Sequence, residues 1–226
     1  MLIKQIDMRA RPVKKIAALG DSITWGMSAS SDNDRWINLV VSMIEYYQKE
    51  KVELINQGIC GNILTTNSPA YEMSAKPSGM ERVYADIISN KPDMVFLAYG
   101  LNDSRGGTSP DVFRKEYQKL IEMILKEIDA TIVVLNTYYM HEEFYKSCEG
   151  WNKSSYSITE EFNLIIKQLA EKNDLIYADI YSAQAGVDWI VSDDHCHPND
   201  LGHRIIANKV FEAIVRNCSF LNNNNQ

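Results

Sequence analysis

The chain has 226 residues, of which 45% are hydrophobic and 23% charged, the balance of an ordinary soluble globular protein, and this length suits one α/β domain spanning residues 1–226. The formal net charge of -7 repels phosphate backbones and argues against nucleic acid as a partner. The sequence contains no run of about 18 apolar residues, which argues against a transmembrane helix.

Along the chain, short apolar runs alternate with longer amphipathic stretches. The apolar runs predict buried strands at 15–20, 52–56, 94–99, 131–135 and 175–179. Apolar residues at helical spacing predict helices at 35–49, 79–89, 111–128, 158–171 and 200–216. This alternation is typical of βαβ units. We therefore expect a parallel sheet that is covered on both faces and binds its ligand beyond the carboxyl ends of its strands.

Two segments, 61–78 and 138–157, fit no regular element. Both follow a predicted strand, so we expect both at the ligand-binding edge of the sheet, where loops of this length are usually functional. The last residues, 221–226, form a polar tail that we expect to be disordered.

The N-terminus and the cysteines bear on the compartment. Residues 1–7 lack the apolar core of a signal peptide, so the default expectation is a cytoplasmic protein, although a leader outside this sequence would permit export. Cys60, Cys148, Cys196 and Cys218 are irregularly spaced and include no Cys-x-x-Cys motif. This pattern favours free thiols over a disulfide framework.

A serine follows the first predicted strand, in the segment Gly20-Asp21-Ser22-Ile23. On a strand-to-helix turn its hydroxyl would be exposed at the carboxyl edge of the sheet, and its own N–H would point towards a developing oxyanion. Asp and Ser are also the preferred helix caps. From this segment alone, a nucleophile and a helix cap are equally good interpretations.

A serine nucleophile needs a base and a group that orients the base. Residues 193–202 hold the densest set of suitable side chains, and within them Asp194 and His197 stand three apart, just before a predicted helix. That spacing lets a carboxylate hold one ring nitrogen of the imidazole while the other faces the serine. His195 is the rival base, and a zinc site is a further alternative for this cluster.

Two more turns follow predicted strands and can supply oxyanion donors. In Gly100-Leu101-Asn102-Asp103 the Asn102 amide can donate, although such a sequence is also ordinary turn chemistry. In Gly58-Ile59-Cys60-Gly61-Asn62 a glycine can present an unencumbered N–H beside Ser22, and the residues alone leave Gly58 and Gly61 both open.

Together, and in this order, the four motifs resemble those of the SGNH/GDSL hydrolase superfamily over residues 16–202. The first block has Ile23 where the family has Leu. The resemblance implies a flavodoxin-like three-layer α/β/α sandwich with a five-stranded parallel sheet. It also implies a catalytic triad of Ser22, Asp194 and His197, and an oxyanion hole formed by Ser22, Gly61 and Asn102. It favours His197 over His195 as the base, and Gly61 over Gly58 as the oxyanion donor.

The implied reaction is ester hydrolysis through an acyl-enzyme on Ser22, with no metal and no cofactor. Because the base must be neutral, we expect kcat/KM to rise with pH through roughly 6 to 7. The chain contains no Gly-x-Ser-x-Gly motif, which argues against the nucleophile elbow of the α/β-hydrolases.

The sequence indicates the substrate less clearly than it indicates the reaction. Trp25, Tyr99, Trp151 and Trp189 lie near the motifs or in the long loops, and with Asp21 the first three are candidate substrate contacts. Aromatic rings stack on sugars, which favours short acyl or acetyl esters of carbohydrates, although aromatics also fill ordinary cores. A lysophospholipase or acyl-thioesterase is the alternative within the superfamily. A non-catalytic flavodoxin-like module that binds a nucleotide or phosphate is the alternative outside it.

Overall fold

The computed structural model describes residues 6–146 and 148–222. Five parallel strands form one sheet in the order β2-β1-β3-β4-β5. They are β1 (Lys15–Gly20), β2 (Glu53–Gly58), β3 (Met94–Ala98), β4 (Thr131–Leu135) and β5 (Ile176–Ala178). All five lie within two residues of the predicted strands, so the predicted parallel α/β architecture is confirmed.

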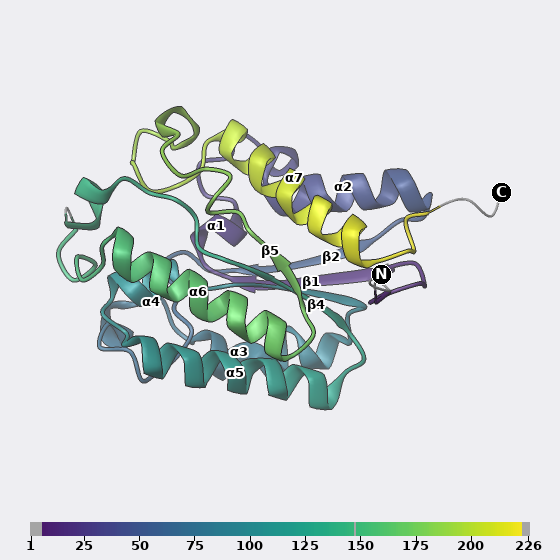
Figure 1. The fold of residues 1–226 in the computed structure, drawn as a ribbon, viewed down its shortest axis with the longest axis horizontal. Helices are drawn as coiled ribbons and strands as arrows, with labels where there is room; N and C mark the ends of the chain where they lie inside the picture. Colours follow the sequence, from purple (N-terminus) through teal and green to yellow (C-terminus); the bar gives the residue numbers. More distant parts are fainter. Residues whose placement is uncertain (1–5, 147, 223–226) are drawn as a thin grey trace, which may run out of the picture.

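Helices cover both faces of this sheet (Figure 1). One face carries α2 (Trp36–Gln48) and α7 (Asp200–Asn217), and the other carries α3 (Gly79–Asp86), α5 (Pro110–Glu127) and α6 (Tyr156–Lys172). Two short helices, α1 (Ser22–Trp25) and α4 (Leu101–Arg105), start just beyond the carboxyl ends of β1 and β3. The three-layer sandwich is therefore confirmed.

The core divides into two clusters because successive side chains of a strand point to opposite faces of the sheet. In β3, Phe96 packs with the layer of α2 and α7, while its neighbour Val95 packs with the layer of α3, α5 and α6. Both residues are fully buried. This arrangement explains why the central strands read as continuous apolar runs in the sequence.

Two sequence predictions need correction. The sequence predicts a strand at 52–56 that is buried on both faces, but β2 is an edge strand with a partner on one side only, and Leu54 to Gln57 are half-buried. The helix predicted at 79–89 ends at Asp86, and a separate 3-10 turn, Ile88–Asn90, follows it. Short 3-10 turns also occur within both long loops, at Tyr71–Met73 and Glu142–Lys146.

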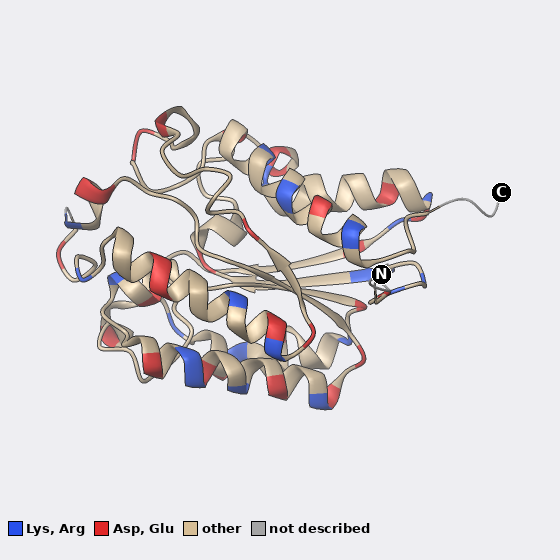
Figure 2. Ribbon diagram, in the orientation of Figure 1, with Lys and Arg blue, Asp and Glu red and all other residues tan. Residues whose placement is uncertain are grey.

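Of the polar tail predicted at 221–226, residues 223–226 lie outside the described residues. Acidic and basic residues are interspersed along the outer helices, for example on α5 (Figure 2). In the described parts of the chain, none of the helices has the length and apolar character needed to cross a membrane.

Candidate active site

Ser22 is the first residue of α1, directly beyond the carboxyl end of β1. The preceding residue, Asp21, is the N-cap, and its carboxylate accepts a hydrogen bond from the N–H of Ile23 at 2.9 Å. Asp21 and Ser22 are both residue types that cap helices well, and in the structure it is Asp21 that caps α1. The Ser22 hydroxyl is left to make a different contact.

That contact is with a histidine 175 residues further along the chain. The Ser22 Oγ lies 2.8 Å from Nε2 of His197, and Nδ1 of His197 lies 2.6 Å from Oδ2 of Asp194. The three side chains thus form one continuous hydrogen-bonded line. In this arrangement the imidazole can take the serine proton through Nε2 while the carboxylate holds Nδ1.

A tight turn between Val191 and Pro198 positions the histidine and the carboxylate. The N–H of Ser192 donates to the carbonyl of His197 at 2.8 Å, which closes the turn. Inside it, His195 adopts a left-handed conformation with φ of 59°. Its ring stacks on Phe144 with 3.9 Å between ring centres. Of the two candidate histidines, His197 therefore contacts Ser22, whereas His195 contacts the 138–157 loop.

The Asp194 carboxylate is held by several donors besides the imidazole. Its Oδ1 accepts hydrogen bonds from the N–H groups of Cys196 and His197, at 2.9 and 2.8 Å, and from the Ser192 hydroxyl at 2.7 Å. Partial burial raises the pKa of Asp194. The hydrogen bonds from His197, Cys196 and Ser192 outweigh that effect and hold the pKa well below its usual range. Asp194 is therefore ionised at every pH at which a histidine can act as a base.

The candidate oxyanion donors come from three neighbouring strand ends. Gly58 uses its N–H to donate to the Asn56 side chain at 3.0 Å, so this N–H is already occupied. Gly61 has φ of 72°, and a Cβ at this position would meet only the backbone nitrogen of Ala75, at 4.0 Å. Among the hydrogen bonds of residues 6–146 and 148–222, none uses the N–H of Gly61 or of Ser22. The geometry is consistent with Gly61 as the donor and excludes Gly58.

Asn102 lies at the start of α4 and is buried. Its side-chain amide donates one N–H to the backbone carbonyl of Asn62 at 3.1 Å. An amide carries two N–H groups, so a second remains for another acceptor. Asn62 was not singled out from the sequence, because its role depends on a contact across 40 residues.

Two buried carboxyl groups, Asp21 and Asp103, lie behind this site. Burial raises the pKa of Asp103 to about 7, and the neighbouring charge of Asp21 adds to the effect, although the N–H of Leu64 donates to Oδ1 at 2.9 Å. Burial likewise raises the pKa of Asp21 to about 6, against the hydrogen bond from Ile23. Oδ2 of Asp103 has no hydrogen-bond partner among the described residues.

The raised pKa of Asp103 predicts a pH-dependent stability. Because the folded-state pKa of about 7 exceeds the ordinary value of 3.8, the folded protein binds more protons between these limits. The free energy of unfolding must then fall as pH rises through that window. We expect Asp103→Asn to make the fall between pH 5 and pH 8 shallower by on the order of 2 kcal/mol in urea titrations. An identical pH slope in the variant and the wild type would contradict this assignment.

Two predicted substrate contacts need correction. Tyr99 is 2% exposed, and its hydroxyl donates to Asn62 Oδ1 at 2.6 Å, so it is part of the core and does not stack on a ligand. The Asp21 carboxylate is buried as the cap of α1 and does not face solvent. By contrast, Trp25 is 42% exposed with Arg35 above its ring, and Trp151 is half-buried beside Gly106.

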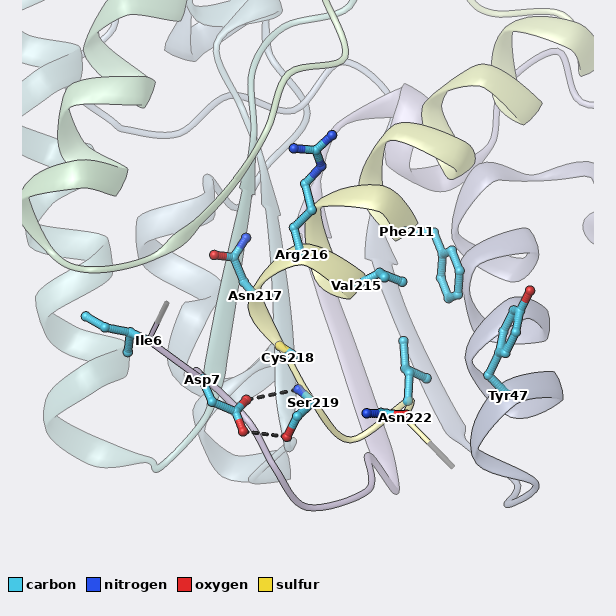
Figure 3. Close-up of a pocket in the computed structure, with 11 residues that line it drawn as sticks. Ile6, Asp7, Tyr47, Phe211, Val215, Arg216, Asn217, Cys218, Ser219 and Asn222 are labelled. Carbon is cyan, nitrogen blue, oxygen red and sulfur yellow. Dashed lines mark hydrogen bonds between the residues drawn. The ribbon is translucent and has the colours of Figure 1, made fainter. Parts of the chain in front are cut away.

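A groove of about 590 Å³ lies elsewhere, between α2 and the C-terminal end of α7 (Figure 3). Tyr47, Phe211 and Val215 form its apolar wall, and Asp7 and Ser219 are hydrogen-bonded at its base. It lies at the end of the sheet where the strands begin, away from Ser22.

The sequence left a zinc site as an alternative for the cluster around His197. In the described part of the chain, no group of three or more His, Cys, Asp or Glu is arranged to hold a metal ion.

Comparisons with known proteins identify the family and the fold. Residues 18–205 match the family described as the GDSL-like lipase/acylhydrolase family. The chain is 23% identical to an acetylxylan esterase of Geobacillus stearothermophilus over 229 residues, which cover 89% of this chain and 94% of the relative.

Two solved structures share the fold. A lipase/acylhydrolase from Enterococcus faecalis has a TM-score of 0.70 at 20% identity and covers 89% of this chain and 95% of its own. Axe2, an acetylxylan esterase from Geobacillus stearothermophilus, has a TM-score of 0.68 at 19% identity and covers 91% and 96%. With the family match spanning β1 to α7, the chain belongs to the GDSL-like lipase/acylhydrolase family and is a serine ester hydrolase.

Proposed function

We propose that this enzyme hydrolyses carboxylic esters through an acyl-enzyme on Ser22, with His197 as the general base and Asp194 as the group that orients it. The observation that carries the proposal is the pair of hydrogen bonds, at 2.8 and 2.6 Å, that joins the three side chains. His197 takes the hydroxyl proton as Ser22 attacks the carbonyl carbon, and returns it to the leaving alcohol. Water, activated by His197, then releases the acid.

The tetrahedral intermediate carries a negative charge that needs hydrogen-bond donors. We assign this role to the N–H groups of Ser22 and Gly61 and to the second N–H of the Asn102 side chain. Support comes from the unoccupied state of the two backbone donors and from the bond to Asn62 that orients the Asn102 amide. Because Asn102 is buried, its amide can act with little competition from water.

Replacing Asn102 with alanine removes one oxyanion donor. We expect kcat to fall by about 10²–10³ with a smaller change in KM, because the lost hydrogen bond is strongest in the transition state. Steady-state kinetics on a p-nitrophenyl ester measure this. Asn90→Ala is the control, because the Asn90 side chain donates to the backbone carbonyls of Ala85 and Asp86, the last two residues of α3, and the variant should retain wild-type kcat. An Asn102→Ala kcat within twofold of wild type would remove Asn102 from the oxyanion hole.

For the substrate we propose short acyl esters, in particular acetyl groups on carbohydrates. The acetylxylan esterase relative supports this choice. The exposed rings of Trp25 and Trp189 add support, because exposed aromatics suit the apolar faces of sugars.

A lipase or lysophospholipase is the second candidate, favoured by the fold shared with the Enterococcus faecalis lipase/acylhydrolase. A series of p-nitrophenyl esters from C2 to C12, assayed beside acetylated xylan, separates the two. We expect kcat/KM to be highest at C2 and to fall with chain length, with acetate released from the acetylated xylan. A kcat/KM that rises towards C8 or longer would favour the lipase.

A further inference from the structure

Arg82 is a buried arginine that the proposed chemistry does not use. It lies on α3 and is 3% exposed. Its nearest acidic partner is Asp86, one turn later on the same helix, at 2.8 Å. Burying a guanidinium is costly unless its donors are satisfied, so the remaining contacts of Arg82 indicate why a charge is retained there.

Those contacts reach the carboxyl ends of three adjacent strands. Nη2 of Arg82 donates to the carbonyl of Gly20 at 3.0 Å, and Nη1 donates to the carbonyl of Gln57 at 2.8 Å. These residues stand at the ends of β1 and β2. Nη2 also lies 2.7 Å from the hydroxyl of Tyr99, directly after β3. One side chain therefore ties together the ends of β2, β1 and β3.

The same guanidinium also holds Asn62, the residue after Gly61. Nε and Nη2 of Arg82 donate to Oδ1 of Asn62 at 3.3 and 3.0 Å, and the Tyr99 hydroxyl donates to the same oxygen at 2.6 Å. The Asn62 amide donates back to the carbonyls of Ala75 and Pro77, at 2.7 and 2.8 Å, so its side chain is anchored at both ends. Asn62 is 0% exposed.

Each strand end in this network carries one proposed oxyanion donor. Gly20 precedes Ser22 by two residues, Asn62 follows Gly61, and Tyr99 precedes Asn102 by three residues. The Asn62 carbonyl also accepts the hydrogen bond from the Asn102 amide. One buried side chain, Arg82, therefore contacts all three segments that carry the proposed donors, in addition to the backbone pairing of their strands. A displacement of about 1 Å in such groups can cost on the order of 10²-fold in rate.

We propose that Arg82 is a positioning residue that sets the geometry of the oxyanion hole. The inference rests on the proposed function. Arg82 is not a catalytic residue, because its donors are directed to strand ends and to Asn62, away from the Ser22 hydroxyl. Replacing Arg82 should therefore weaken binding of the transition state more than binding of the substrate. We expect kcat to fall while KM stays nearly unchanged.

The test is Arg82→Lys, which keeps the positive charge but replaces a planar fork of five donors with a single ammonium group. We expect kcat to fall by about 10- to 100-fold and KM to change by less than about threefold. The affinity for an alkylboronic acid, which forms a tetrahedral adduct on serine, should fall by about the same factor as kcat/KM. The midpoint of the pH–rate profile should not move, because the Ser22–His197–Asp194 line is intact.

Arg9 provides a matched control. It is also buried, at 5% exposed, and donates to Asp93 and to the carbonyls of Arg11 and Pro12. Its bonds lie at the opposite end of the sheet, where the strands begin. Arg9→Lys should lower the free energy of unfolding and leave kcat unchanged when both variants are assayed well below their melting temperatures. Equal kcat losses in the two variants would overturn the proposal by showing a merely structural effect.

Other outcomes are also decisive. A folded Arg82→Lys enzyme with wild-type kcat, or with a loss confined to KM, overturns the proposal. If Arg82→Lys does not fold, Tyr99→Phe removes two hydrogen bonds from the same network, the one from Arg82 and the one to Asn62. A lower kcat at constant KM then supports the proposal, and an unchanged kcat refutes it. Failure of a fluorophosphonate probe to label folded wild type would instead refute the proposed function, and this inference with it.

Discussion

Ser22→Ala is expected to reduce kcat for ester hydrolysis by about 10⁶-fold, to the level left by substrate binding and the oxyanion donors alone. The reason is the position of its hydroxyl, 2.8 Å from Nε2 of His197 at the end of β1. With no side-chain oxygen, no acyl-enzyme can form. Assays on p-nitrophenyl acetate and labelling with a fluorophosphonate probe both measure this, and the variant should show no labelling.

The serine and the histidine should act as a unit. His197→Ala is expected to cost about as much as Ser22→Ala, and the double variant little more than either, because each change alone disables the same step. Thermal unfolding should give similar melting temperatures for wild type and Ser22→Ala, since only a hydroxyl is lost. Ser22→Ala retaining more than about one-thousandth of the wild-type kcat would be incompatible with Ser22 as the nucleophile.

Asp194→Asn should produce the second large effect, a fall in kcat of about 10⁴-fold. Oδ1 can persist as an acceptor for the N–H groups of Cys196 and His197, so the turn should keep its shape. The new amide, however, presents N–H groups to Nδ1 of His197 where a carboxylate oxygen now stands at 2.6 Å. The imidazole must then accept at Nδ1 and carry its proton on Nε2, which is the wrong tautomer for taking a proton from Ser22.

Asp193→Asn serves as the control because it makes the same chemical change at the exposed adjacent residue. It should leave kcat within about twofold, because an exposed surface charge contributes little. The low pKa of Asp194 adds a pH criterion: the wild-type rate should show no loss attributable to Asp194 protonation above pH 4 or so. Equal rates for Asp193→Asn and Asp194→Asn would contradict the assignment of Asp194.

Much of the fold was predictable from the sequence because the relevant signals are local. Apolar runs of strand length and helical periodicity are set by which side chains must be buried, and all five strands occur within two residues of their predicted limits. The exception is β2, which lies within two residues of its predicted limits but is less buried than predicted. Its apolar run does not reveal that it lies at the edge of the sheet, because strand order is decided by packing between distant segments.

The site was predictable to the extent that its residues follow strands or lie close together in sequence. Asp194 and His197 are three apart, and Ser22 and Asn102 begin short helices just beyond strand ends. Resemblance to a known family, and not the residues alone, favoured His197 over His195 and Gly61 over Gly58. The structure gives the physical grounds: His195 turns away to stack on Phe144, and the Gly58 N–H is occupied by Asn56.

The sequence by itself therefore determined the alternation of strands and helices and the segments that hold the candidate nucleophile and base, because periodicity and short spacing are properties of neighbouring residues. The tertiary structure alone decided that Tyr99 is a core residue, that Asn62 holds the Asn102 amide, and that Arg82 joins three strand ends. These roles depend on hydrogen bonds between residues up to 62 positions apart. Such bonds exist only once the strands are aligned side by side, so no local pattern encodes them.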